Sequence, residues 1–348
     1  MSRVILFHLL SNVRAVAVVA FMVAIPVDAM AELVADFYAG KTITIYVGFT
    51  AGGGYDLYAR QLAPFLTKHI PGKPAVIVKN MPGAGSLKLA VYMQNVAPRD
   101  GTELATVSRG APAEALLAGN RIKFDPVISN WIGSMNNEVS ICALMAQSGA
   151  ATLEDLKKRE FLLGTQGIGS DSALFSVFIK NLFGAKLKIL TGYSGTNESI
   201  LAMERGEVDG NCGWSWSTAK QTHPHWFRDK TVNIIMQMAL SKHRDLPDVP
   251  AVTEFARNHD EKSQIDLVMS RQLMGRPFFA PPAVPPERIA ALRKAFMDAM
   301  KDFEFTDAAK KADLEINPVP GEEVQALVER LFKAPAHVVA ATRKNIEF

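Results

Sequence analysis

The chain of 348 residues contains only two cysteines, Cys142 and Cys212, and their separation is far too large for a C-x-x-C pair. Metal-binding and redox motifs that depend on closely spaced cysteines are therefore excluded. If the protein is exported, the two cysteines could form a disulfide. Both also lie in apolar stretches, where two buried free thiols are an equally good interpretation. The sequence leaves these alternatives open.

A strong charge of one sign is also absent. The chain has 38 Lys and Arg against 35 Asp and Glu, which gives a formal net charge of +3. A nucleic-acid-binding domain usually carries a clear basic excess, so this balance argues against a nucleic-acid partner.

No complete catalytic or metal-binding motif is present. The segment Gly192–Thr196 lacks the last glycine of the G-x-S-x-G nucleophile elbow. His223 and His225 flank a proline and have no third ligand nearby, whereas a zinc site needs three or four. We therefore expect no enzymatic activity, no metal and no cofactor.

After the N-terminal region no apolar run approaches the roughly 20 residues that cross a membrane. The shorter run Ala15–Ile25 follows Arg3 and Arg14 and precedes the small-x-small triplet Ala29–Ala31. This order is typical of a cleaved export signal, with a membrane anchor as the alternative. We predict a signal peptide at 1–31, a mature chain that begins near Glu32, and a location in the periplasm. Because no cysteine lies at the cleavage point, no lipid anchor is expected.

What the sequence does contain is a regular alternation of short apolar strands and amphipathic helices. Such alternation predicts an α/β fold with mostly parallel sheets. Strands are predicted at 43–47, 75–78, 103–107, 161–165, 187–190, 208–211 and 232–236, with two more extended pieces within 131–145 and one ending near 278. Helices are predicted at 55–62, 87–96, 112–117, 152–158, 172–183, 197–205, 287–300, 322–332 and 335–343.

The first glycine-rich loop lies between the strand at 43–47 and the helix that follows it. Glycines allow a ligand to approach main-chain N–H groups, and the first N–H groups of a helix are unpaired and lie at its positive end. We therefore predict an anion site made by Thr50, Ala51, Gly52, Gly53, Gly54 and Tyr55. A side chain at Gly53 is expected to block this approach and to conflict with the required φ. The dinucleotide and P-loop fingerprints do not match this loop.

A second loop of the same kind follows the strand at 161–165. Gly169, Ser170 and Asp171 precede the next helix and are predicted to form a second anion site. Ligands of open α/β sheets bind beyond the carboxyl ends of strands. Two such loops on separate sheets could therefore face each other across a cleft and hold a ligand with carboxylates. Ser170 and Ser172 could instead cap the helix.

Several single residues complete the predicted site. Ser108 and Arg109 are both assigned to the ligand site. Arg109 could pair bidentately with a carboxylate, or it could be a solvated surface residue. Asn80 is expected to be a turn residue first and a ligand neighbour second. Asp56 is expected to accept hydrogen bonds from free N–H groups rather than to contact an anionic ligand.

The aromatic residues leave two alternatives. Tyr193 lies in a glycine-flanked turn that buries little, so we place it in the cleft. Trp214 and Trp216 share a face if the chain is extended there. They then line the cleft together or pack in the core together; Trp214 is assigned to the ligand site.

Six segments, taken in order, resemble the Bug family, the extracytoplasmic substrate-binding proteins of tripartite tricarboxylate transporters. The segments are Gly48–Asp56, Asn80–Ser86, Ala97–Gly101, Gly167–Ser170, Gly192–Gly195 and Leu246–Glu254. The resemblance implies a two-domain periplasmic-binding-protein fold of the type II kind, with two mixed, mostly parallel sheets joined by crossing hinge strands. It also implies a carboxylate held by backbone amides, hydroxyls and bridging waters.

The chain departs from this family at several positions. Tyr55 stands where the family usually has a small residue, and Gly48 stands where it commonly has proline. The segment Trp214–Trp216 replaces a more aliphatic one. We therefore expect a ligand other than a short dicarboxylate, in a pocket that is larger or favours aromatic groups.

These observations lead to one domain division and one function. The first domain is predicted to comprise 32–134 and 271–348 and the second 135–270, with crossings near Ser134–Ser140 and Ser270–Phe278. The predicted function is an exported, monomeric solute-binding protein that delivers a small organic carboxylate to membrane transporter subunits. The alternatives are an exported α/β hydrolase and a ligand-sensing partner of a membrane sensor kinase.

Overall fold

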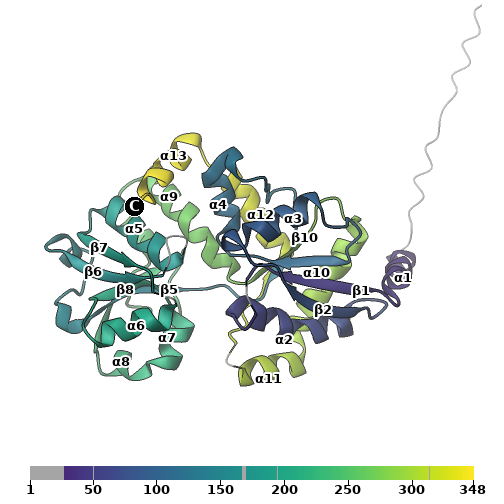
Figure 1. Cartoon of the computed structure of the whole chain (residues 1–348), viewed down its shortest axis with the longest axis horizontal. Helices are drawn as coiled ribbons and strands as arrows, with labels where there is room; N and C mark the ends of the chain where they lie inside the picture. Colours follow the sequence, from purple (N-terminus) through teal and green to yellow (C-terminus); the bar gives the residue numbers. More distant parts are fainter. Residues whose placement is uncertain (1–26, 50, 167–169, 194, 313) are drawn as a thin grey trace, which may run out of the picture.

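Two β-sheets, each covered by helices, form two lobes that lie side by side (Figure 1). The computed structural model describes residues 27–49, 51–166, 170–193, 195–312 and 314–348. The helices of this described part are α1 Val27–Tyr38, α2 Gly54–His69, α3 Leu87–Asn95, α4 Ala111–Ala118, α5 Asp171–Phe183, α6 Thr196–Glu204, α7 Trp216–Thr222, α8 Pro224–Arg228, α9 His259–Met269, α10 Pro286–Lys301, α11 Phe303–Lys311, α12 Gly321–Phe332 and α13 Ala336–Asn345.

The first sheet has the strand order β11-β4-β10-β3-β1-β2. Its strands are β1 Thr42–Val47, β2 Ala75–Asn80, β3 Glu103–Thr106, β4 Asn130–Ser134, β10 Pro277–Ala280 and β11 Val319–Pro320. β1 runs parallel to β2 and β3, and β10 runs antiparallel to its neighbours β3 and β4. Four of the strands therefore point the same way, with β10 and β11 reversed.

The second sheet has the order β7-β6-β8-β5-β9. Its strands are β5 Ser140–Met145, β6 Phe161–Thr165, β7 Leu187–Thr191, β8 Gly210–Ser215 and β9 Val232–Met238. β6 is parallel to β7 and β8, whereas β5 is antiparallel to β8 and β9. Both sheets are thus mixed, and most strands in each share one direction, which confirms the predicted fold class.

Each lobe has its own apolar core. In the first, the β1 residues Ile43 and Ile45 are fully buried against Leu62 of α2 and Phe296 of α10. In the second, strands β5, β6 and β8 pack against α5 and α9. Burial on this scale, at about 25 cal/mol per Å² of apolar surface, is the main stabilising contribution to each lobe.

The chain passes between the sheets twice, once after β4 and once before β10, where the crossings are predicted. The two crossing segments are hydrogen-bonded to each other. Met135 N donates to Arg276 O (3.1 Å), and Glu138 N donates to Gln272 O (2.7 Å). Glu138 and Arg276 of these paired segments line the space between the lobes.

The last helix, α13, contacts both lobes. It packs against α4 beside the first sheet and against α5 and α9 beside the second (Figure 1). The predicted division assigns this helix to the first domain alone. Because α13 contacts both lobes, the assignment of the C-terminal segment to the first domain stays a prediction.

Some elements differ from those predicted. The helix expected at 152–158 is only a 3₁₀ turn at Asp155–Lys157, although Thr152 and Asp155 exchange hydrogen bonds with each other's backbone N–H groups (3.0 and 3.2 Å). β8 lies later than the strand expected at 208–211, and α7, α8, α9 and α11 have no counterpart among the predicted elements. The short apolar stretches in these helices lack the length that makes helical periodicity recognisable.

Helix α1 spans the predicted cleavage point after Ala31. Val34 and Tyr38 lie beyond that point and are buried in the first core. Within the described residues, none of the helices combines the length and the apolar character that crossing a bilayer requires.

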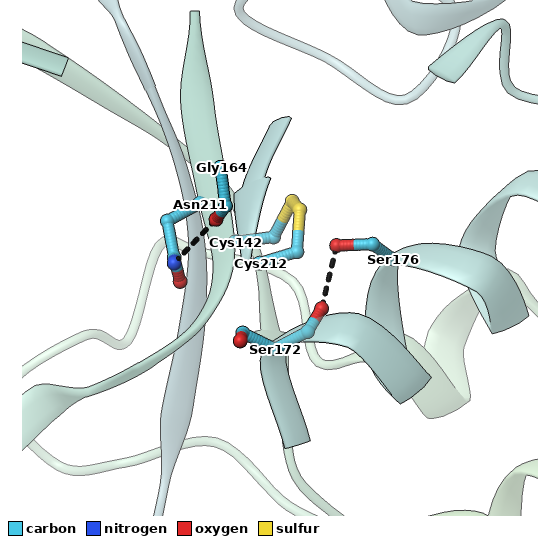
Figure 2. Close-up of a disulfide and its surroundings, with 6 residues drawn as sticks. All are labelled: Cys142, Gly164, Ser172, Ser176, Asn211 and Cys212. Atoms are coloured by element: carbon cyan, nitrogen blue, oxygen red, sulfur yellow. Dashed lines mark hydrogen bonds between the residues drawn. A yellow bond between two sulfur atoms is a disulfide. The ribbon is translucent and has the colours of Figure 1, made fainter. Parts of the chain in front are cut away.

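The two cysteines form a disulfide between adjacent strands. Cys142 of β5 lies opposite Cys212 of β8, and the bond is fully buried on the side of the sheet that faces α5 (Figure 2). It closes a loop with a sequence separation of 70 residues, for which the chain-entropy estimate is about 4 kcal/mol of stabilisation. The structure thus decides between the two alternatives that the sequence leaves open.

Candidate ligand-binding site

An inner cavity of about 470 Å³ lies between the lobes and is lined from both sheets. Its lining residues are Phe49, Gly54, Tyr55, Ser108, Arg109, Glu138, Gln166, Ser170, Asp171, Ser172, Thr196, Gly213, Trp214, Ser215, Thr218 and Arg276. An outer cavity of about 920 Å³ shares five of these residues. The volume of the inner cavity is typical of a small-molecule site.

Local geometry explains the first glycine loop. Gly48 approaches Ser86 so closely that a Cβ at position 48 would lie 2.3 Å from the Ser86 Cβ. Gly52 has φ +81°, a left-handed conformation that favours glycine. Gly53 caps α2 with φ −79° and ψ 167°, which any residue adopts. The φ conflict expected at Gly53 is therefore wrong; the residue that requires a positive φ is Gly52.

Asp56 holds this loop from behind. Its carboxylate accepts hydrogen bonds from Gly52 N (2.8 Å), Arg60 Nε (2.9 Å) and Asn80 Nδ2 (2.8 Å). The hydrogen bond from Arg60 makes the largest contribution, and the pKa of Asp56 falls to about 2. This confirms that Asp56 accepts from free N–H groups. Asn80 also donates to Phe49 O (3.0 Å) and supports the loop without lining either cavity.

The second loop ends in a capped helix. Ser170 Oγ accepts from Ala173 N (3.2 Å) as the N-cap of α5, and it also lines the inner cavity. Ser172 Oγ accepts from Gln166 N (3.3 Å). Both roles considered for Ser170, helix cap and cavity residue, are thus compatible in the structure.

The first residues of both helices line the same cavity. Gly54 and Tyr55 begin α2, and Asp171 and Ser172 begin α5. The first turn of each helix, which is the positive end of its dipole, therefore lies beside one space.

Arg109 is not a solvated surface residue, and its guanidinium is already paired with a carboxylate of the protein. Its side chain is only 11% exposed, and its Nε donates to Asp171 Oδ2 (2.6 Å) while its Nη2 contacts the same oxygen. Arg271 Nη1 donates to the other oxygen, Asp171 Oδ1 (2.8 Å). Arg109 Nη1 also lies 3.8 Å from Glu138 Oε2. These contacts join the β3–α4 loop of the first lobe to the start of α5 in the second.

The electrostatics of this cluster favour the charged forms. Burial raises the pKa of the Asp171 carboxyl, but Arg109 and Arg271 outweigh burial and lower that pKa to about 2. Burial likewise opposes the charge of Arg109, while Asp171 and Glu138 raise the pKa of Arg109 above its usual value. The cluster is therefore a buried, interlobe ion-pair network.

The aromatic residues mostly contact one another. Trp214 is only 1% exposed and packs in a core with Trp226 and Phe227, although its edge lines the inner cavity. Tyr55 stacks on Phe49 with ring centroids 4.4 Å apart. One face of the Tyr55 ring is therefore covered by Phe49, and Trp214 is almost wholly buried.

Tyr193 and Trp216 pack against the same core as Trp214. Neither residue lines the inner or the outer cavity of the described chain. Of the two alternatives for the tryptophans, packing in the core is the better description, because nearly all of the surface of both side chains is buried.

The predicted site residues fall into three groups. Gly54, Tyr55, Ser108, Arg109, Ser170, Asp171 and Trp214 line the inner cavity. Ala51, Gly52, Gly53, Asn80 and Tyr193 lie outside its lining. Thr50 and Gly169 lie outside the described residues.

Sequence reasoning missed three charged residues of the site, Glu138, Arg271 and Arg276. All three lie on or beside the crossing segments, which run along the base of the cleft. The predicted crossings are the signal that could have found them, because polar residues on a segment between two lobes tend to face the space between those lobes. In the described part of the chain, no group of three or more His, Cys, Asp or Glu is placed to hold a metal ion.

The sequence profile of the family described as "Tripartite tricarboxylate transporter family receptor" matches residues 58–336. The chain belongs to this family. It is a solute-binding protein, as the resemblance of its motifs indicates. It is 27% identical over 294 residues to the "UPF0065 protein in gbd 5'region" of Cupriavidus necator, with 82% of each chain covered. A second relative, from Agrobacterium vitis, is 25% identical over 333 residues, covering 92% of this chain and 90% of the relative.

Solved structures share the fold of this receptor. A TctC solute-binding protein from Polaromonas has a TM-score of 0.66 at 18% identity, and the periplasmic binding protein BugD has a TM-score of 0.62 at 21% identity. Each comparison covers 89% of this chain and 99% of the other. MatC from Rhodopseudomonas palustris, solved with bound malate, has a TM-score of 0.59 at 19% identity, covering 88% of this chain and 99% of MatC.

Proposed function

We propose that this receptor captures a small organic carboxylate in the inner cavity and delivers it, chemically unchanged, to the membrane subunits of a tripartite transporter. The observation that carries the proposal is that the first residues of α2 and α5 line one cavity. Helix N-termini favour anions. The structural neighbours solved with malate and with adipate, MatC and a second R. palustris protein, support a carboxylate ligand.

Among the predicted site residues, those that line the cavity and those that support it have different proposed roles. Arg109 and Asp171 act as an interlobe ion pair at its wall, and Asn80 acts behind the first loop. Gly54, Tyr55, Ser108 and Ser170 stay in direct reach of a ligand. Gly52 shapes the loop through its positive φ.

The proposed location is the periplasm, after removal of residues 1–31. Cleavage there would keep Val34 and Tyr38, the residues that anchor α1 in the first core. The Cys142–Cys212 disulfide is in keeping with an oxidising compartment. We propose that the mature protein acts as a monomer and needs no cofactor.

The two alternative functions receive less support. A hydrolase of the Ser–His or Cys–His kind needs a histidine beside its nucleophile, and the described lining of the inner cavity contains neither histidine nor cysteine. A ligand-sensing partner of a sensor kinase would use the same cavity and differ only in its docking surface. The family description favours transport.

A thermal-shift screen of the purified exported protein tests the proposal. The panel comprises mono-, di- and tricarboxylates, with and without hydroxyl groups, and matched neutral amides as controls. A ligand that binds only the native state stabilises it by about 2.7 kcal/mol at a hundred times its Kd, so at least one carboxylate should raise the melting temperature while its amide does not. Absence of any carboxylate effect, together with turnover of an ester or amide, would contradict the proposal.

A further inference from the structure

Among the described residues, four charged side chains line the inner cavity, those of Arg109, Glu138, Asp171 and Arg276. Arg109 is paired with Asp171. The Glu138 carboxylate accepts from Ser215 Oγ and lies 3.8 Å from Arg109 Nη1. Arg276 has no carboxylate within 4.0 Å among the residues that the structure describes. Within the described part of the chain, Arg276 is therefore the cation of the cavity that lacks an ion-pair partner, and it is available to a ligand anion.

The structure holds the Arg276 guanidinium in a defined position. It lies 4.8 Å from the ring centroid of Tyr55 and 5.0 Å from that of Tyr58. Its Nη1 donates to Gly275 O (2.7 Å), whereas its Nε is buried without a hydrogen-bond acceptor in the described chain. Its Nη2 lies 3.4 Å from where a Cβ of Gly54 would be. An anion beside Nη2 would thus also meet the first residue of α2. A guanidinium fixed in this way loses little entropy on binding a carboxylate.

The rest of the lining favours hydroxyl groups over a second carboxylate. Among the described residues, six serine and threonine side chains line the inner cavity, those of Ser108, Ser170, Ser172, Thr196, Ser215 and Thr218. A hydroxyl both donates and accepts, so it can pair with a ligand hydroxyl in either direction. Asp171 and Glu138 also line the cavity, and a second ligand carboxylate close to either of them would meet a like charge, which is unfavourable.

We infer that Arg276 pairs with a single carboxylate of the ligand and that the ligand is a polyhydroxylated monocarboxylate, of the sugar-acid class, rather than a dicarboxylate. This inference rests on the proposed function, because it specifies which carboxylate the receptor takes. It assigns Arg276, a residue of the second crossing segment, as the residue that recognises the charge.

Three acids with six carbons separate the contributions. Gluconate has one carboxylate and several hydroxyls, adipate has two carboxylates and no hydroxyl, and hexanoate has one carboxylate and no hydroxyl. Calorimetry on the exported protein should show that gluconate binds at least tenfold more tightly than either of the others, a difference of about 1.4 kcal/mol. Tighter binding of adipate, or no binding of gluconate while other carboxylates bind, overturns the inference and leaves the proposed function intact.

Variants of Arg276 test its assignment. Arg276→Gln should weaken gluconate binding at least tenfold, and Arg276→Lys should recover part of the loss because it restores the charge without the planar fork. Arg244→Gln is the matched control, because Arg244 lines only the outer cavity and its side chain is 90% exposed. Circular dichroism confirms folding of each variant.

Equal gluconate affinity in Arg276→Gln and the wild type overturns the assignment of Arg276. Failure of every carboxylate in the thermal-shift panel is a different result, since it removes the proposed function itself. The two failures are therefore distinguishable.

Discussion

At the scale of single residues, the notable feature is an acid inside the site of an anion receptor. Asp171 begins α5, where a negative charge is favourable to the helix dipole. Its carboxylate is bound on both oxygens by Arg109 and Arg271. The ion pairs hold together segments that are distant in sequence. Because both carboxylate oxygens of Asp171 are bound by arginines, Asp171 is not available to bind a cationic ligand.

We expect Asp171→Asn to destabilise the protein at neutral pH. The pKa of Asp171 is lowered to about 2, so its stabilising effect is complete above the ordinary carboxyl pKa of about 3.9 and is lost as the pH falls toward 2. The linked contribution is about 2 kcal/mol. Thermal unfolding should show a lower melting temperature for the variant at pH 7, with about half of that stability difference left at pH 3 and less still toward pH 2.

Asp307→Asn is the control for this prediction. Asp307 pairs with Lys311 on the exposed surface of α11, where an ion pair contributes at most about 1 kcal/mol. If Asp171→Asn melts at the wild-type temperature at pH 7, the buried pair gives no net stabilisation.

At the scale of elements, two strand–loop–helix units are placed so that their helices begin at one cavity. β1 leads into α2 and β6 leads into α5, and the two strands belong to different sheets. In each unit the positive end of the helix is the part that lines the cavity. Adjacent glycines in the first loop nevertheless have different roles, since Gly54 lines the cavity and Gly53 does not.

We expect Gly54→Val to weaken carboxylate binding more than tenfold, about 1.4 kcal/mol, without loss of folding. A side chain at position 54 would lie 3.4 Å from Arg276 Nη2, within the space proposed for the anion. Gly54 has no positive φ that valine would strain. Calorimetry with the tightest acid from the screen measures the loss.

Gly53→Val is the matched control. Gly53 has an extended backbone and lies outside the lining of the cavity, so its substitution should change affinity only a few-fold. Equal losses for the two variants would mean that the whole loop, rather than its last glycine, contacts the ligand.

At the scale of the whole molecule, the lobes are joined by more than the two crossing segments. Leu117 of α4, Leu267 of α9, Leu331 of α12 and Val339 of α13 form an apolar cluster that spans both lobes. Asn181 of α5 also donates to backbone oxygens near the C-terminus. Two-domain receptors of this kind are expected to close around a ligand by hinge motion. The cluster includes Val339 of α13, the helix that spans the two lobes in Figure 1. We expect it to limit how far the lobes separate.

We expect Val339→Asp to loosen the contact between the lobes. Val339 is 8% exposed, and an unpaired charge there should cost about 2–4 kcal/mol. The variant should melt at a lower temperature, and small-angle scattering should show a larger radius of gyration than for the wild type. Val96→Asp, at a residue that is 69% exposed, provides the same substitution without burial. Identical scattering from Val339→Asp and the wild type would show that α13 does not restrain the lobes.

Much of the fold could be established from the sequence alone, because it depends on local signals. The alternation of strands and helices and the glycine loops before α2 and α5 each rest on a few neighbouring residues, whereas the prediction of the two crossings rests on the family resemblance and on the need for two facing sheets. The family likewise follows from short segments in order, and the profile match confirms it. Asp56 could be assigned to its loop because its partner Gly52 is close in sequence.

The charge pattern of the site could not be obtained in this way. Arg109 is separated by 62 residues from Asp171, and Asp171 by 100 from Arg271. The pairing of Cys142 with Cys212 depends on β5 and β8 being neighbours in the sheet. Whether Arg276 is available to a ligand or pairs with an Asp or Glu side chain of the protein depends on which side chains fill the space between the lobes. Such choices depend on sheet order and on competition among charges for a small buried volume, and no local periodicity records either of them.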